Sequence, residues 1–295
     1  NRTWFFDGFI PSSYGQGLFK ILAIVANQIA AGEVVERPAS VVRELVENAL
    51  DARPTRVEIT LQQGGKRRIL VIDDGIGMGR EDALISLERH ATSKIRVADD
   101  LRTVSTLGFR GEALPSIAAV SRMTLETRVE AEDVGTRIRI KSGTITGVED
   151  FPRQRGTTVE VANLFFNAPA RSKFLKATGA ETRAVAEVVN VLAMANVGVG
   201  FTLTADSQVL LELPSVEYLH ARIVEIWGPE NGRTLIPVAL ELGATRVRGL
   251  VQRPDATRKG PRRAYSFVNG RPFRSRHLWA AVLFPGLAGA DNRHI

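Results

Sequence analysis

The sequence contains no cysteine, and this absence excludes several chemistries at once. Disulfide bonds, thiolate catalysis and cysteine-ligated zinc are ruled out, and an intracellular compartment is slightly favoured. Histidine is also scarce: four occur, at positions 90, 220, 277 and 294, and they lack the spacing of metal ligands. No apolar run approaches the ~20 residues that cross a bilayer, so we expect no membrane partner.

The common signatures of phosphate-binding and hydrolytic sites are missing as well. The chain has no Gly-x-x-x-x-Gly-Lys-Ser/Thr loop and no Gly-x-Gly-x-x-Gly segment after a predicted strand. It also has no His-Glu-x-x-His and no nucleophile elbow. Any nucleotide site must therefore be built in another way.

The composition is that of a globular protein. The 295 residues are enough for two domains, and 44% of them are apolar and 24% charged. Short strand-like runs mixed with amphipathic helical runs predict an α+β fold. The net charge of +7 and the pI near 10.1 favour a polyanionic partner.

We divide the chain into three parts. Residues 1–19 hold 6 of the 19 aromatic residues and begin at asparagine. We interpret them as an atypical arm, either a fragment end or a docking arm, since they lack the features of a signal peptide. Residues 20–214 are predicted to form the first domain, with Pro214 at the boundary. Residues 215–295 are predicted to form a second domain, truncated at its C-terminus.

The hydrophobic periodicity predicts the order of helices and strands. Helices are expected between Pro38 and Pro54, at 81–90, up to 119, at 181–195 and at 220–227. Strands are expected at 56–61, 68–72, 200–204, 208–213, 233–238 and 245–251. Several short strands should lie between 124 and 161, with turns at Gly135, Ser142-Gly143 and Gly147.

The stretch Arg43–Ala52 carries the most informative pattern. Its apolar residues recur every three or four positions, as on a helix with one buried face. The polar residues share another face: Glu44, Glu47, Asn48 and Asp51. A solvated face is the simpler interpretation, but asparagine is a weak helix former. A carboxylate one turn from an amide oxygen also suits a water-activating base beside a hard cation such as Mg²⁺.

Two glycine-containing turns point to the same kind of site. In Asp73-x-Gly75-x-Gly77, a carboxylate at a strand end can accept a hydrogen bond from an exocyclic amine such as that of adenine. The glycines let the backbone approach a flat ring, although an ordinary Asp-Gly turn is the simpler interpretation of this motif alone. Gly108–Leu114 precedes a helical pattern, where backbone N–H groups can bind a phosphate; a capped loop is the alternative.

The later part of the second domain is strongly basic. Only one acid, Asp255, lies among eight cations: Arg253, Arg258, Lys259, Arg262, Arg263, Arg271, Arg274 and Arg276. Arginines that neutralise phosphates bind DNA without reading its sequence. We therefore predict DNA contacts for Arg262, Arg263, Arg271, Arg274 and Arg276, with a solubilising face as the alternative.

The motifs occur together in a specific order. Glu44 and Asn48 are followed by Asp73-x-Gly-x-Gly, Arg89-His90-Ala91-Thr92-Ser93-Lys94 and Gly108-Phe109-Arg110-Gly111-Glu112-Ala113-Leu114. Three further segments belong to the pattern: Ile29–Val35, Leu164–Arg171 and Val268–Arg271. In combination, over about residues 20–281, they resemble the GHKL ATPases and, within them, the MutL family of mismatch-repair proteins. This resemblance implies a GHKL-type α/β sandwich followed by a domain similar to those of gyrase B and a ribosomal small-subunit protein.

The resemblance also implies a site for ATP and Mg²⁺, residue by residue. Glu44 would be the general base that activates water, and Asn48 would hold the magnesium ion that bridges the phosphates. Asp73 would contact the adenine amine, with Gly75, Gly77 and Met78 shaping the base pocket and Thr158 lying near Asp73. A lid over the triphosphate would be formed by Thr92, Ser93 and Lys94 with Gly108, Phe109, Arg110, Gly111, Glu112, Ala113 and Leu114.

In this family, nucleotide binding drives two such regions to dimerise and to close a clamp over DNA. A homodimer, DNA, a mismatch-sensor protein and downstream repair factors are thus the implied partners. Two departures from the pattern stand out: Arg53-Pro54 replaces an expected glycine, and a lysine of the second domain has no matching segment. Three alternatives therefore stay open: a nucleotide-binding matchmaker with little turnover, another GHKL ATPase, and a nucleotide-free DNA-binding protein.

Overall fold

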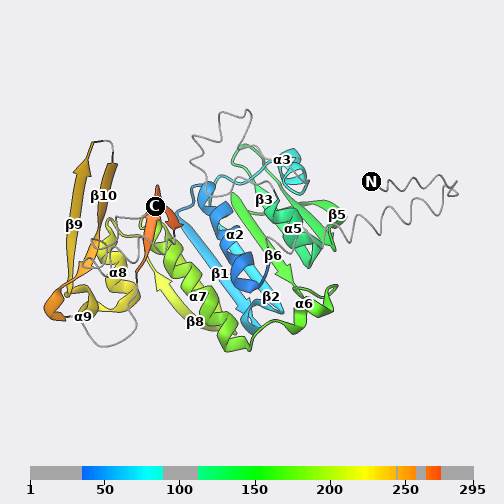
Figure 1. Cartoon of the computed structure of the whole chain (residues 1–295). Coiled ribbons are helices and arrows are strands. Elements are labelled where there is room, and N and C mark those ends of the chain that lie inside the picture. Colours follow the sequence, from blue (N-terminus) through cyan, green and yellow to red (C-terminus); the bar gives the residue numbers. More distant parts are fainter. Residues whose placement is uncertain (1–34, 89–111, 244, 257–263, 274–295) are drawn as a thin grey trace, which may run out of the picture.

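The computed structural model of the chain describes residues 35–88, 112–243, 245–256 and 264–273. Within these ranges an eight-stranded sheet forms the middle of the molecule, and helices cover one of its faces (Figure 1). The described residues also form two separate two-stranded ribbons. No helix in the described part is long and apolar enough to cross a membrane.

The elements have the following bounds. The large sheet contains β1 (Arg56–Gln62), β2 (Arg68–Asp73), β3 (Arg122–Arg128), β4 (Gly135–Lys141), β5 (Thr144–Phe151), β6 (Gly156–Ala162), β7 (Gly200–Ala205) and β8 (Gln208–Leu213). The ribbons pair β9 (Leu235–Leu242) with β10 (Thr245–Gln252) and β11 (Ser266–Val268) with β12 (Arg271–Phe273). The helices are α2 (Pro38–Asp51), α3 (Arg80–Ile85), α5 (Ala113–Ala119), α6 (Pro169–Lys173), α7 (Thr178–Ala195), α8 (Leu219–Trp227) and α9 (Pro229–Gly232).

The strand order in the large sheet is β5-β4-β3-β6-β2-β1-β7-β8. Neighbouring strands are antiparallel except β1 and β7, which are parallel. Strand β2 therefore lies in the interior of the sheet. Its last residue, Asp73, is paired with Val57 of β1 on one side and with Thr157 of β6 on the other.

Strict alternation along the strands decides which face of the sheet is buried. In β2, Ile69, Val71 and Asp73 are buried, and the residues between them are half-buried. Helix α2 packs against β2 with its apolar stripe, which consists of Val41, Val42, Leu45, Val46 and Ala49. Helix α7 packs beside α2 in the same hydrophobic core. Burying apolar surface contributes roughly 25 cal/mol per Å² to stability. The packing of this apolar stripe therefore holds α2 against β2.

Most predicted elements are present, and the differences have local causes. The predicted turn at Gly147 is wrong, since Gly147 lies inside β5 opposite Arg139, where a shift of register accommodates it. Helix α3 ends at Ile85, short of the predicted helix, whose last residues lie outside the described ranges. Strand β9 begins only at Leu235, because the backbone N–H of Arg233 still bonds to Pro229 in the preceding turn.

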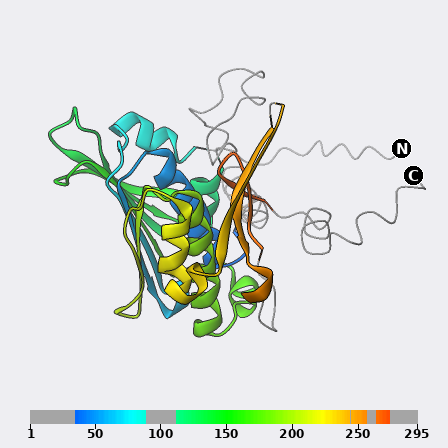
Figure 2. The same ribbon diagram turned by 90° about the vertical axis from the view of Figure 1, so that its left-hand side faces the viewer.

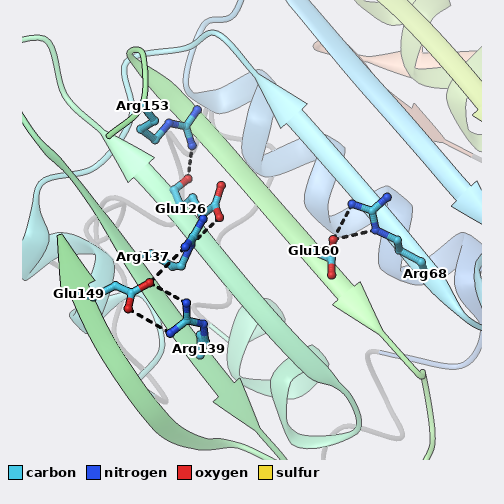
Figure 3. A network of polar contacts seen from close by, with 7 residues as sticks. All are labelled: Arg68, Glu126, Arg137, Arg139, Glu149, Arg153 and Glu160. Atoms are coloured by element: carbon cyan, nitrogen blue, oxygen red, sulfur yellow. Dashed lines mark hydrogen bonds and ion pairs between the residues drawn. The ribbon is translucent and has the colours of Figure 1, made fainter. Parts of the chain in front are cut away.

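The face of the sheet opposite the helices carries a ladder of ion pairs (Figure 3). On it Arg137 bonds to Glu126 at 2.7 Å and to Glu149 at 3.1 Å, and Arg139 bonds to Glu149 at 2.6 Å. These side chains are partly exposed, so water screens each pair and its contribution to stability is small. This face of the sheet is therefore polar, and the hydrophobic core lies on the face that the helices cover.

The segment Leu164–Arg171 is hydrogen-bonded to the end of α5. The Phe165 N–H donates to the Val120 carbonyl at 2.7 Å, although Phe165 must adopt a φ of +64° to do so. The Asn167 side chain donates to the Ala119 carbonyl at 2.9 Å. The strained conformation of a fully buried phenylalanine is tolerated because the surrounding packing and these bonds determine it. This segment, singled out by its sequence, therefore supports the helix that follows the predicted lid.

Helix α8 is anchored to the first domain by a buried arginine. Arg222 is fully buried and donates to the carbonyls of Val197 and Val199 at 2.9 and 2.7 Å. Burial lowers the pKa of its guanidinium, and the ion pair with Glu225 at 3.1 Å opposes that effect. Figure 2 shows α8 beside α7. The predicted boundary at Pro214 thus lies before a helix that packs closely on the first domain.

We expect Arg222→Met to lower the free energy of unfolding by roughly 1–3 kcal/mol, because two half-buried carbonyls lose the Arg222 donor and only that of Val197 keeps another, the Val216 N–H. Urea unfolding followed by circular dichroism measures the change. Arg233→Met is a matched control, since Arg233 forms a similar pair with Glu230 but its side chain is 74% exposed. The control should change stability by less than about 0.5 kcal/mol. Equal effects of the two substitutions would contradict the anchoring role.

Candidate functional site

Helix α2 shows the two faces that the sequence predicts. Its apolar residues are buried, whereas Glu44, Glu47, Asn48 and Asp51 are half-buried. Proline at its first position and Arg37 before it mark its start. The simple solvated face is therefore not what the structure shows, because these polar side chains are only partly accessible.

The start of α2 is fixed by an ion pair. Arg37 donates through Nε and Nη2 to one carboxylate oxygen of Glu181 on α7, at 3.0 and 2.9 Å. The Glu181 side chain is only 1% exposed, so its charge requires this partner. Pairing a buried carboxylate with the residue before α2 holds that helix in one position relative to α7.

The carboxylates of α2 influence each other. The pKa of Glu47 is raised to about 7, first by burial and then by the neighbouring charge of Glu44, while Arg43 and Arg271 act in the opposite direction. The sequence pattern places Glu47 on the polar face of the helix but assigns it no role. Its environment could not be predicted from the sequence, because Arg271 lies more than two hundred positions away in the chain.

Asp73 lies at the end of β2 and is buried, with 6% of its surface exposed. Its carboxylate accepts the backbone N–H of Gly75 at 2.9 Å and that of Thr157. Burial raises the pKa of Asp73 to about 6, and these two hydrogen bonds limit the rise. The bond from Gly75 is the one that an ordinary Asp-Gly turn makes, so that turn is formed. The burial of the carboxylate is a further feature that the turn alone does not require.

The glycines after Asp73 are required by close contacts. A Cβ on Gly75 would lie 2.6 Å from the Ala52 carbonyl oxygen, and one on Gly77 would lie 2.0 Å from that of Arg128. Gly77 also has a φ of +70°, which disfavours other residues. The next residue, Met78, donates its N–H to the Thr127 hydroxyl at 2.8 Å. The loop is thus held between the end of α2 and the end of β3.

The turn between α2 and β1 adapts to the missing glycine. The helix ends at Asp51 as expected, and Arg53 adopts a φ of +54°, a conformation that costs a non-glycine residue roughly 1–2 kcal/mol. The carboxylate of Asp74 supports this turn by accepting the N–H groups of Thr55 and Arg56 at 2.7 and 3.0 Å. The departure from the pattern therefore leaves the local geometry in place.

The expected position of Thr158 is wrong. Thr158 pairs with Ile72, and its side chain lies on the polar face of the sheet. Thr157 is the residue that pairs with Asp73 and is buried on the same face. Because strand side chains alternate, an error of one position moves a residue to the opposite face. The alternation of Val159 and Val161 with polar residues was the signal that identifies Thr157.

The predicted lid is only partly described. Thr92, Ser93, Lys94, Gly108, Phe109, Arg110 and Gly111 lie outside the described residues. Glu112 immediately precedes α5, and Ala113 and Leu114 form its first turn, half-buried. Helix α5 packs against α2. The structure therefore places the end of the lid motif beside the helix that carries Glu44 and Asn48.

Four of the predicted DNA-binding arginines, Arg262, Arg263, Arg274 and Arg276, also lie outside the described residues. The fifth, Arg271, begins β12 and is half-buried. It is close enough to α2 to lower the pKa of Glu47. The DNA contact predicted for Arg271 therefore stays a prediction.

Two family models match the chain. Residues 36–156 match the histidine kinase-, DNA gyrase B- and HSP90-like ATPase family, and residues 223–283 match the C-terminal domain of DNA mismatch repair proteins. Among solved structures, the Aquifex aeolicus MutL ATPase domain complexed with ADP is 33% identical, with a TM-score of 0.65. That match covers 83% of this chain and 86% of the other. The predicted combination of a GHKL fold with a second domain is confirmed.

Curated relatives agree with the structural matches. The DNA mismatch repair protein MutL of Anaeromyxobacter sp. (strain K) is 49% identical over 259 residues, and that of Geobacter sulfurreducens is 48% identical over 260. Each match covers 88% of this chain but only 43% of the relative, so the chain spans less than half the length of these proteins. By its motifs, fold and relatives, the chain belongs to the MutL family of DNA mismatch repair proteins and comprises a GHKL ATPase domain followed by the second domain of that family.

Proposed function

We propose that the chain binds ATP with Mg²⁺ and hydrolyses it slowly, as the nucleotide-dependent switch of a DNA mismatch repair protein. One observation carries this proposal: the loop that holds the buried Asp73 is bonded directly to the end of the helix that holds Glu44 and Asn48. The bond runs from the Ile76 N–H to the Ala52 carbonyl at 3.0 Å. The carboxylate proposed to bind adenine is thereby held in one rigid unit with Glu44 and Asn48, the pair proposed to act in hydrolysis.

Asp73 is suited to recognise adenine. When ionised, its carboxylate only accepts hydrogen bonds, and the two backbone N–H donors leave it further acceptor capacity for an amine. The adjacent glycines keep the loop flat and close to α2. A buried carboxylate that binds an exocyclic amine makes the site specific, because a nucleobase without that amine would leave the carboxylate without its partner.

Glu44 is proposed as the general base that removes a proton from the attacking water. It lies one turn before Asn48 on the same face of α2, and it is half-buried. Partial burial limits the access of bulk water while leaving the carboxylate able to reach a nucleotide. Positioned general bases contribute roughly 10²- to 10⁴-fold to a rate.

The amide oxygen of Asn48 fits a magnesium ion. It is a hard, neutral oxygen donor, half-buried beside two carboxylates, and Mg²⁺ in nucleotide sites takes few protein ligands together with phosphate oxygens. When bound, the ion would neutralise charge that develops on the phosphates. Asn48 would hold the ion, and Lys94 with the segment 108–114 would close over the triphosphate.

Nucleotide binding is proposed to drive two copies of the region together into a clamp around DNA. Slow hydrolysis suits this role, because the clamp must persist until turnover opens it. The excess of positive charge supports binding to DNA through phosphates, with little dependence on base sequence. A mismatch-sensor protein and downstream repair factors are the proposed protein partners, as the family membership suggests.

We expect Glu44→Ala to bind ATP about as well as the wild type and to lose turnover by roughly 10²-fold or more, because only the proton acceptor is removed. Phosphate release measures turnover, and a fluorescent ATP analogue measures affinity. Glu58→Ala is the control, since Glu58 lies on β1 with its side chain 40% exposed. Turnover in Glu44→Ala equal to that of the control would exclude Glu44 as the base.

The affinity for ATP should depend on pH through Asp73. Its pKa is raised to about 6, so the carboxylate is protonated below that pH and becomes an acceptor as the pH rises through it. The affinity should therefore increase between pH 5 and pH 7 in the wild type. Asp73→Asn carries no titrating group at this position, so the step from Asp73 should be missing while the steps from Glu47 and from the nucleotide phosphates remain. Calorimetric titrations that give identical pH profiles for both proteins would contradict this role.

Dimerisation should follow nucleotide binding. With a non-hydrolysable ATP analogue and Mg²⁺, gel filtration with light scattering should show a shift from monomer to dimer, since nucleotide binding is proposed to drive two copies together. Glu44→Ala should remain dimeric with ATP itself, because it binds without turnover. Asn48→Ala should not shift. A wild-type chain that stays monomeric at a saturating concentration of the analogue would argue against the clamp.

A further inference from the structure

A shallow pocket lies at the end of the large sheet that is remote from Asp73. It has a volume of about 300 Å³, and its walls come from the turn between β1 and β2, the residues after β6, and α6 with the residues that follow it (Figure 1). Lys66 and Arg67 come just before β2, whereas Asp73 ends that strand. The length of β2, roughly 17 Å, therefore separates this pocket from the proposed adenine site.

Hydrogen bonds hold the walls of the pocket in place. The Leu164 N–H donates to the Lys66 carbonyl at 3.1 Å, which joins the residues after β6 to the turn before β2. On the other wall, the Lys176 N–H donates to the buried carboxylate of Glu181 at 2.8 Å. Both walls are thus fixed to neighbouring segments. A ligand would meet a pocket that is already formed, which lowers the entropic cost of binding.

The pocket has an apolar lining with aromatic rings beside it. Leu164 is buried and Leu175 is half-buried, and both line the pocket. Phe166, also in the lining, is 37% exposed, and the guanidinium of Arg122 lies 5.3 Å from the centre of its ring. Phe174, which follows α6, is 85% exposed. An apolar side chain placed here would remove much of this surface from water, which favours binding.

Positive charge surrounds this apolar surface. Four cations line the pocket or follow each other closely in its α6 wall: Lys66, Arg67, Lys173 and Lys176. Within the described part of the chain, none of the four forms an ion pair. Two neighbouring carboxylates are already bonded, Glu181 to Arg37 and Asp206 to the N–H of Gln63. The cations are therefore available to a ligand that carries carboxylates.

We propose that this pocket binds an acidic segment of a partner protein. One large apolar side chain of that segment would fill the pocket, and its carboxylates would lie beside the four cations. A volume at the lower end of the range for ligand pockets suits a single side chain. Duplex DNA fits less well, because its phosphates would bind the cations and leave the apolar lining uncovered. The inference does not depend on the proposed hydrolysis of ATP, because the pocket is remote from Asp73.

Fluorescence anisotropy with the full chain tests the proposal. The probe is a short fluorescein-labelled peptide rich in aspartate and glutamate, with one phenylalanine at its centre. Combining Lys66→Glu with Arg67→Glu should weaken its binding roughly tenfold or more, because two attractions become repulsions. Ser172→Trp should also weaken binding, because it fills the pocket from an exposed position without changing the charge. Circular dichroism checks that each variant is folded.

A control variant separates the pocket from charge in general. Arg246→Glu with Arg248→Glu, on the exposed β9–β10 ribbon, gives the same change in net charge and should alter the affinity less than about twofold. Replacing the phenylalanine of the probe with serine should weaken binding to the wild type roughly tenfold or more.

Four results would overturn the proposal. The first is a probe that does not bind the wild type. The second is a control variant that weakens binding as much as the pocket variants do, and the third is a probe that binds equally well without its phenylalanine. The fourth is a fluorescein-labelled single-stranded oligonucleotide that binds more tightly than the peptide and loses affinity in the same pocket variants, which would assign the pocket to nucleic acid.

Discussion

The loop after β2 is in direct contact with the end of α2, through Gly75 and Ile76 on one side and Ala52 on the other. The Ile76 N–H donates to the Ala52 carbonyl at 3.0 Å, and a side chain at position 75 would collide with that same carbonyl. Glycine at this position is therefore the condition for the contact. The contact sets the position of the buried Asp73 relative to the polar face of α2. The proposed adenine recognition and the proposed hydrolysis both depend on that relation.

Charge is stabilised differently at the two ends of α2. At its start, the almost fully buried Glu181 is paired with Arg37, and both groups are held by well-formed hydrogen bonds. Farther along, Glu44 and Glu47 lie together in a half-buried environment, which raises the pKa of Glu47 to about 7. Crowded carboxylates of this kind oppose stability and are typical of functional sites. Helix α2 is thus anchored at its start by an ion pair, whereas the carboxylates farther along it are crowded.

Local patterns were sufficient to predict α2, β2 and β6, because their periodicity reflects which face packs on the core. The same patterns gave wrong predictions where a shift of one residue along a strand changes the outcome. Thr158 was expected beside Asp73, yet the pairing of β2 with β6 places Thr157 there and turns Thr158 to the other face. A turn was expected at Gly147, but a shift of register lets β5 continue through it. Registers between strands depend on long-range pairing, which one segment does not encode.

The sequence by itself determined the family pattern, the amphipathic helix with Glu44 and Asn48, and the strand that ends in Asp73, because each is written in consecutive residues. Only the tertiary structure decided that Asp73 is buried and that Glu47 is crowded by other carboxylates. Burial and electrostatic neighbours are sums over residues distant in the chain, so they exist only once the fold has brought those residues together.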